Sequence, residues 1–215
     1  MFKSKRSIIE LLTIIFVVSI IIANTIVGKT WKPFPGIDFE VTAAFLFFIF
    51  PMIVGDILAE VLPKRDFNKV ILYGFGANLL MAIVYTLVTI LPNPDSFVVD
   101  AYNLVLGQSL LVFIASMTGY LLGSYTNAFI VWALKAKHGE NNFKLRAWVS
   151  TIFGQIVDNF FFQIIALYFA FKMPFEVVLI IFISETFLEI IIETLFLPIT
   201  HALVKRYRKS PEVLV

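Results

Sequence analysis

The sequence lacks cysteine entirely and contains only two histidines, His138 and His201. The absence of cysteine excludes disulfides and thiolate metal ligands. Neither histidine belongs to an HExxH motif, and no glycine-rich phosphate loop is present, so the sequence offers neither a zinc-protease site nor a nucleotide site. A Ser-His dyad is not expected either, because His138 lies in a basic loop and His201 lies near the end of an apolar segment. We therefore expect a protein that is not an enzyme and needs neither a cofactor nor a metal.

Charged residues are also scarce, at 15% of the chain, whereas 60% of the residues are hydrophobic and 24 are Phe. A soluble domain is nearer 45–50% apolar. Apolar segments long enough to cross a bilayer, which takes about 20 residues, lie at 7–27, 41–62, 70–91, 104–132, 149–171 and 177–203. The sequence predicts an all-α integral membrane protein, with residues 1–215 forming one domain, a compact bundle of six transmembrane helices.

Basic residues are distributed unevenly among the loops between these segments. If the N-terminus is cytoplasmic, all of the 17 basic residues except Lys29, Lys32 and Lys172 lie on the cytoplasmic side. Cytoplasmic loops carry an excess of Lys and Arg. We therefore expect a multi-pass protein of the bacterial plasma (inner) membrane with both termini cytoplasmic. The basic patches then orient the chain and contact lipid head groups, and no nucleic-acid partner is expected.

The segment 177–203 carries three carboxyl groups, on Glu185, Glu189 and Glu193. Residues four apart share a helix face, and a charged side chain at the bilayer centre costs roughly 3 kcal/mol on insertion scales. The three side chains should therefore face the bundle interior. Glu189 and Glu193 are candidates for a proton relay, the alternative being a purely structural ladder of carboxyl groups.

Further polar side chains interrupt the other apolar segments. Asp158 lies near the middle of 149–171 without a basic partner in the membrane. It is either held protonated by neighbouring amides or paired with a ligand. The spacing of Thr151, Gln155, Asp158 and Phe162 places them on one helical face. Asn24, Asn78 and Asp56 lie in the first three segments, where the two asparagines have a cap or an interhelical hydrogen bond as their structural alternative. The candidate substrate-binding residues are Asp158, Gln155, Asn24, Asp56, Asn78, Glu185, Glu189 and Phe162.

A GxxxG pattern, Gly119 to Gly123, lies in the segment 104–132. Such a pattern lets two helix backbones approach closely. It predicts either a contact within the chain or a homodimer through this face.

Four stretches resemble the queuosine precursor transporter family, the VUT-type vitamin uptake transporters. They are STIFGQIVDNF at 150–160 after Arg146, GDILAEV at 55–61, ANTIVGK at 23–29 and ETLFLPIT at 193–200. Lys is common in that family near the position of Glu189, where this chain departs from the pattern.

The resemblance implies import of 7-cyano-7-deazaguanine, 7-aminomethyl-7-deazaguanine or queuine, which feed queuosine modification of tRNA. A carboxylate accepts two adjacent N–H groups of such a base, so we expect Asp158 and Gln155 to bind the base edge. Glu185, Glu189 or Asp56 would meet an amine or carry a proton. The alternative is a vitamin-binding subunit of an ATP-driven energy-coupling transporter. Those subunits often have an Ala-xxx-Ala face on the first helix, which this chain lacks.

Overall fold

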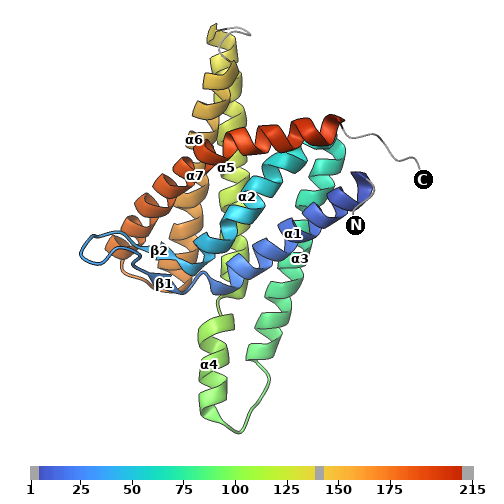
Figure 1. Ribbon diagram of the computed structural model, residues 1–215. Coiled ribbons are helices and arrows are strands. Elements are labelled where there is room, and N and C mark those ends of the chain that lie inside the picture. Colours follow the sequence, from blue (N-terminus) through green and yellow to red (C-terminus); the bar gives the residue numbers. More distant parts are fainter. Residues whose placement is uncertain (1–4, 139–142, 210–215) are drawn as a thin grey trace.

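The computed structural model describes residues 5–138 and 143–209 (Figure 1). The chain is helical along most of its length, and the all-α membrane bundle predicted from the sequence is confirmed. The elements are α1 (Lys5–Ile26), β1 (Thr30–Trp31), β2 (Val41–Thr42), α2 (Ala43–Val61), α3 (Lys64–Thr89), α4 (Ser96–Leu106), α5 (Ser109–His138), α6 (Phe143–Gln163), the π-helix η1 (Ile164–Ala170) and α7 (Phe175–Lys209).

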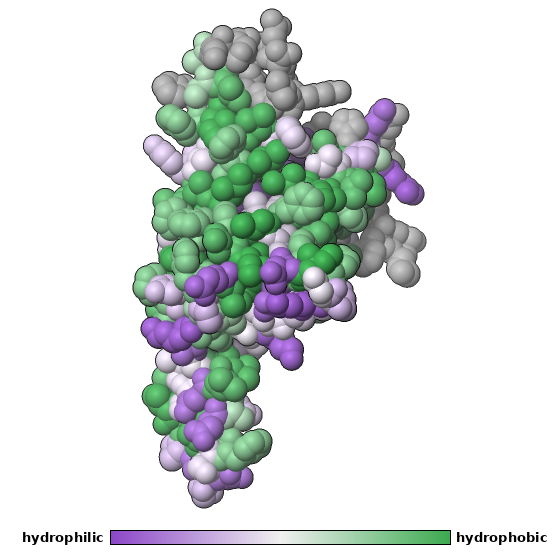
Figure 2. All heavy atoms as spheres, turned by 90° about the vertical axis from the view of Figure 1, so that its left-hand side faces the viewer, coloured by the Kyte–Doolittle hydropathy of each residue, from purple (hydrophilic) through white to green (hydrophobic). Residues whose placement is uncertain are grey.

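Among the described residues, 5 helical stretches are long and apolar enough to cross a membrane: α1, α2, α3, Ser96–Val131 and Trp148–Ala170. The sixth predicted span, α7, is 35 residues long, and its glutamates set it apart in composition. Glu185 and Glu189 are buried, whereas Ile183 and Phe187 on the opposite face are exposed. α7 therefore turns an apolar face outward, as a membrane helix must. Figure 2 shows hydrophobic side chains over most of one face, with hydrophilic ones gathered in a band across its lower half.

The helices form two groups. α1 packs along α2 and also contacts α3, while α5 packs along α6 and η1, and α6 contacts α7. The groups meet where α2 touches α7 and where α3 touches α5. A buried apolar cluster that includes Val27, Ala44, Ala115, Leu167 and Ile181 joins both groups near the β1–β2 end of the bundle. That end is therefore packed tightly, which leaves any opening to the other end.

Several helix boundaries differ from the predicted spans, two of them in an informative way. The single helix expected over 104–132 is α4 followed by α5, with a break at Gly107. The start of α4 is capped by Asp95, which accepts a hydrogen bond from the Phe97 N–H at 2.9 Å. The segment expected at 70–91 begins earlier, at Lys64, because its charged first turn is helical although it is not apolar. Two elements were not predicted at all, namely the short antiparallel pair β1–β2 and the π-helix η1.

The ends of the helices agree with the predicted separation of basic residues. The Lys5 ammonium lies 5.3 Å from the Tyr207 ring centroid, so the start of α1 adjoins the end of α7. The α2–α3 turn lies toward the same end of the bundle, and β1–β2 lies toward the other (Figure 1). Lys3 and the side chains of Lys144 and Arg146 lie outside the described part of the chain. Which end faces the cytoplasm stays a prediction.

Candidate functional site

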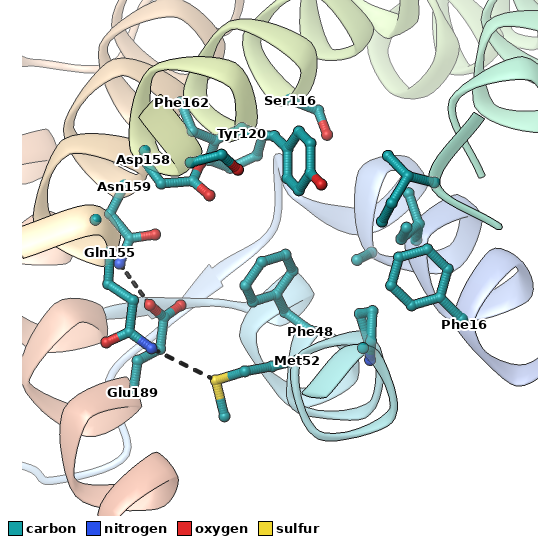
Figure 3. A pocket seen from close by; sticks show the side chains of 18 of the residues that line it. Phe16, Phe48, Met52, Ser116, Tyr120, Gln155, Asp158, Asn159, Phe162 and Glu189 are labelled. Atoms are coloured by element: carbon teal, nitrogen blue, oxygen red, sulfur yellow. Dashed lines mark hydrogen bonds between the residues drawn. The ribbon is translucent and has the colours of Figure 1, made fainter. Parts of the chain in front are cut away.

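A cavity of about 300 Å³ lies between the two helix groups (Figure 3). Its lining comes from α1, α2 and α3 on one side and from α5, α6 and α7 on the other. The structure brings together all of the predicted substrate-binding residues except Asn78 at this cavity. Those lining it are Asp158, Gln155, Asn24, Asp56, Glu185, Glu189 and Phe162.

A ladder of amide–carboxyl hydrogen bonds joins α6 to α7 beside the cavity. The Gln163 amide donates to Glu185 Oε2 at 2.7 Å, and the Asn159 amide donates to Glu189 Oε2 at 2.6 Å. In the third rung, Gln155 donates to Glu193. Because α6 and α7 run in opposite directions, three amides spaced by four residues meet three glutamates with the same spacing. The amide N–H groups of α6 are thereby paired with the glutamates of α7, whereas the Oε1 atoms of Gln155 and Gln163 are buried without a partner among the described residues.

Asp158 stands apart from this ladder. It projects from α6 toward α5 and lines the cavity near Tyr120 (Figure 3). No residue in the described ranges donates a hydrogen bond to its carboxyl group. A carboxyl group in this position retains its full capacity to accept hydrogen bonds from a ligand. The structural alternative, in which neighbouring amides hold Asp158, has no support among the described residues, because the α6 amides at 155, 159 and 163 face α7 instead.

The close approach of α5 to α6 depends on glycine. A Cβ atom at Gly123 would lie 2.8 Å from the Gly154 carbonyl oxygen and from Asp158 Cβ, and one at Gly119 would lie 2.8 Å from the Asp158 carbonyl oxygen. The GxxxG face predicted for a homodimer or an internal contact thus packs against α6 of the same chain. This packing fixes the position of Asp158 at the cavity wall.

The wall opposite Asp158 is aromatic. Five phenylalanines from α1, α2 and α3 line this side: Phe16, Phe45, Phe48, Phe67 and Phe75. Phe75 also meets Tyr120 of α5 edge to face, with ring centroids 5.1 Å apart. The cavity therefore combines a face suited to a flat ring with a face suited to that ring's polar edge.

The two ends of the cavity differ in closure. At the β1–β2 end, Glu185 Oε1 accepts hydrogen bonds from the Thr42 N–H at 2.6 Å and from the Thr42 hydroxyl at 2.7 Å. Beside it, the Glu40 N–H donates to Ser184 Oγ at 3.3 Å. At the other end, Asp56 and Ala59 line the cavity and are exposed. The cavity is thus sealed at one end and open beside Asp56.

Two predicted residues lie outside the cavity lining. Glu193 accepts the hydrogen bond from Gln155 at the end of the ladder. Asn78 is fully buried, and neither of its side-chain polar atoms has a partner among the residues described. The interhelical hydrogen bond that is the structural alternative for Asn78 is likewise not formed. The hydroxyl groups of Thr86 and Thr126, by comparison, donate hydrogen bonds to backbone carbonyl groups of their own helices.

The sequence reasoning missed the five phenylalanines and Tyr120 of the lining. It also missed three hydrogen-bonding residues of the ladder and the sealed end, namely Asn159, Gln163 and Thr42. A signal was present for the first two, because Gln155, Asn159 and Gln163 repeat the four-residue spacing of the α7 glutamates. Thr42 gave only a cap signal, and it does cap α2 by accepting a hydrogen bond from the Phe45 N–H at 3.3 Å. The described residues contain no group of three or more His, Asp or Glu that could hold a metal ion.

Comparison with known proteins gives one match. No curated protein and no solved structure matches the chain. Residues 42–203 match a family model described as "Putative vitamin uptake transporter", and this range includes α2, α3 and the whole polar wall of the cavity. The family comprises transporters and not enzymes, as the missing catalytic motifs led us to expect. Since the match covers well over half of the sequence, the chain belongs to the putative vitamin uptake transporter family.

Proposed function

We propose that the protein imports 7-deazaguanine bases that are precursors of queuosine: 7-cyano-7-deazaguanine, 7-aminomethyl-7-deazaguanine or queuine. Membership of an uptake-transporter family supports the transport part of the proposal. The sequence stretches at 23–29, 55–61, 150–160 and 193–200, which resemble queuosine precursor transporters, support the substrate.

The observation that carries the proposal is the free carboxyl group of Asp158 opposite an aromatic wall. The aminopyrimidinone edge of a deazaguanine offers two adjacent N–H donors, which one carboxylate accepts in a bidentate manner. The flat ring then lies against phenylalanine side chains such as Phe48. The cavity, at about 300 Å³, reaches the lower end of the range of small-molecule sites, about 300–1,000 Å³.

The hydrogen-bond pattern assigns different roles to the two amides expected at the base. Gln155 uses its amide nitrogen for Glu193, and its Oε1 atom is buried without a partner. It therefore offers a ligand an acceptor and not the donor that a ring carbonyl needs. Asn24 lines the cavity, and its Nδ2 atom is buried without a partner. Asn24 is thus the donor for the ring carbonyl.

The proposal extends to the direction and the driving force of transport. With both termini cytoplasmic in a bacterial plasma membrane, the open end of the cavity beside Asp56 faces inward and the sealed end at Thr42 faces outward. Glu189 and Glu193 lie on consecutive rungs of the ladder, where carboxyl groups one helical turn apart can hold and pass a proton. Import is then coupled to protons and needs neither a nucleic acid nor an ATP-driven partner.

Uptake into proteoliposomes that contain only this protein tests the function. Radiolabelled 7-deazaguanines should accumulate, guanine should compete poorly, and Asp158→Asn should abolish uptake while membrane insertion and folding are retained. Glu176→Gln, which removes a carboxylate from the first turn of α7 outside the cavity lining, is the matched control. Wild-type uptake by Asp158→Asn would remove this residue from the site. Uptake that requires an added ATP-driven module would favour the energy-coupling alternative.

A further inference from the structure

The charged side chains that line the cavity, among those the structure describes, are all acidic. Asp56, Asp158, Glu185 and Glu189 contribute to the lining, and no Lys or Arg whose side chain is described does so. We propose that the cavity selects a ligand that carries a positively charged amine, and that Glu189 is the residue that binds this amine. The inference rests on the proposed function, and among the proposed substrates it selects the aminomethyl base over the neutral cyano base.

The physical basis is the balance of charge at bilayer depth. An ionised carboxyl group buried without a counter-charge is strongly disfavoured, so it holds a proton or pairs with a cation. Asp158 and Glu189 lie close enough to interact electrostatically, as do Glu185 and Glu193 with Glu189. Because none of these groups has a basic partner in the described part of the chain, the cation must be a proton or must arrive with the ligand.

The hydrogen bonds identify which carboxyl group receives the amine. Both oxygens of Glu185 are occupied, Oε1 by Thr42 and Oε2 by Gln163. Asp56 lies at the exposed edge, where water competes with a ligand. Glu189 uses Oε2 for the Asn159 amide and has no hydrogen bond at Oε1 from the described residues. It is 4% exposed and lines the cavity, so a charge-assisted bond there is shielded from water.

Asn24 supplies a second, independent sign that this cavity binds a ligand. Its side chain is 8% exposed, it lines the cavity from the wall opposite Glu189, and its amide nitrogen has no hydrogen-bond acceptor within the part of the chain described. A buried donor without a partner is costly, and a ligand acceptor removes that cost. The polar pattern of the cavity is therefore a cation at Glu189, N–H donors at Asp158 and an acceptor atom at Asn24.

Binding of the amine also releases a proton. In the empty cavity the Glu189 carboxyl group holds its proton. When the ammonium group arrives, the O–H bond of the carboxylic acid breaks, the proton leaves to solvent and an ammonium–carboxylate pair forms. One positive charge enters and one leaves, so the occupied cavity has the same net charge as the empty one. A neutral base gives no such exchange.

Binding of the aminomethyl and cyano bases to the purified full-length protein, measured at one pH by calorimetry, tests the inference. The aminomethyl base should bind at least about tenfold more tightly, which corresponds to one charge-assisted hydrogen bond. Glu189→Gln should remove this preference and leave the affinity for the cyano base within about twofold, because the amide side chain still reaches Asn159. Glu185→Gln, one turn away, should change both affinities by a similar factor and so preserve their ratio.

Proton release supplies a readout that does not depend on a folded variant. In weakly buffered solution with a pH-sensitive dye, the wild-type protein should release about one proton more per aminomethyl base than per cyano base, because any proton lost from Asp158 is common to both ligands. Equal or tighter binding of the cyano base by the wild-type protein, or binding of the amine without this additional proton, would overturn the inference and leave the proposed function standing. Binding of neither base by folded protein would instead remove the proposed function.

Discussion

The two walls of the cavity differ in the kind of contact that each offers to a ligand. The wall from α1, α2 and α3 presents phenylalanine rings, which provide contact area but little direction. The wall from α5, α6 and α7 presents carboxyl and amide groups, whose hydrogen bonds have fixed directions. Affinity for a flat ring would therefore come mainly from the phenylalanine wall, and the choice among flat rings would come from the polar wall together with Asn24 of α1.

The largest effect is expected where the polar wall depends on close packing. Gly123→Ala places a methyl group 2.8 Å from the Gly154 carbonyl oxygen and Asp158 Cβ, and overpacking of this kind costs about 1–3 kcal/mol. We expect lower thermal stability in detergent together with loss of ligand binding, because α6 and Asp158 shift. Gly76→Ala is the matched control, since a Cβ there meets no atom within 4 Å. Equal stability of the two variants would contradict the packing of α5 against α6.

A smaller effect is expected at the aromatic wall. Phe48→Ala should weaken binding of every deazaguanine by about 1–3 kcal/mol, the range of base–aromatic stacking. The ratio of affinities between two bases should not change, because the phenyl ring makes no directional bond. Phe50→Ala is the control, since Phe50 is exposed and does not line the cavity. Competition binding with a set of bases measures both quantities, and a changed ratio in Phe48→Ala would show that the aromatic wall also discriminates.

At the sealed end, Thr42 joins the two walls through Glu185. Thr42→Val keeps the shape and the backbone N–H donor but removes the hydroxyl that bonds to Glu185 and caps α2. We expect a loss of stability of about 1 kcal/mol, and Thr42→Ser should restore most of it. Thermal unfolding of the three proteins is the measurement. Unchanged stability in Thr42→Val would mean that the hydroxyl does not hold this end closed.

The smallest effect is expected at Asn78, which belongs to neither wall. Asn78→Leu replaces a buried amide without partners by an apolar side chain of similar size. Ligand affinity should stay the same, and stability should stay equal or rise by about 1 kcal/mol. Weaker ligand binding would place Asn78 in the site, as its polar character in an apolar segment first suggested.

The helices and the acidic residues of the cavity could be predicted from the sequence because both follow from one physical rule. A polar group in an apolar segment must face the protein interior, and that rule brought Asp158, Asp56, Asn24 and Glu189 to a common cavity. The same rule also brought in Asn78, which lies outside the cavity lining, since the rule distinguishes interior from lipid but not a cavity from a packed core.

The partners of the polar groups could not be predicted in the same way. Gln155 was expected to bind the ligand together with Asp158, and it donates to Glu193 because α7 runs antiparallel to α6 in matching register. That register depends on η1 and the turn that follows it, where Lys172 has a positive φ of 55°. Hydropathy carries no information on a π-helix. The four-residue spacing of the amides could therefore be read from the sequence, but which glutamate each amide pairs with could not.

The α6–α7 ladder has a consequence for movement along the membrane normal. Its rungs repeat every four residues on both helices, at Gln155, Asn159 and Gln163 on α6 and at the three glutamates on α7. A slide of α7 by one rung, about 6 Å, would bring each of two amides opposite the neighbouring glutamate and leave only one amide and one glutamate without a counterpart. The interface thus has a second register that keeps two of the three amide–carboxyl pairs, so sliding would replace hydrogen bonds instead of merely breaking them.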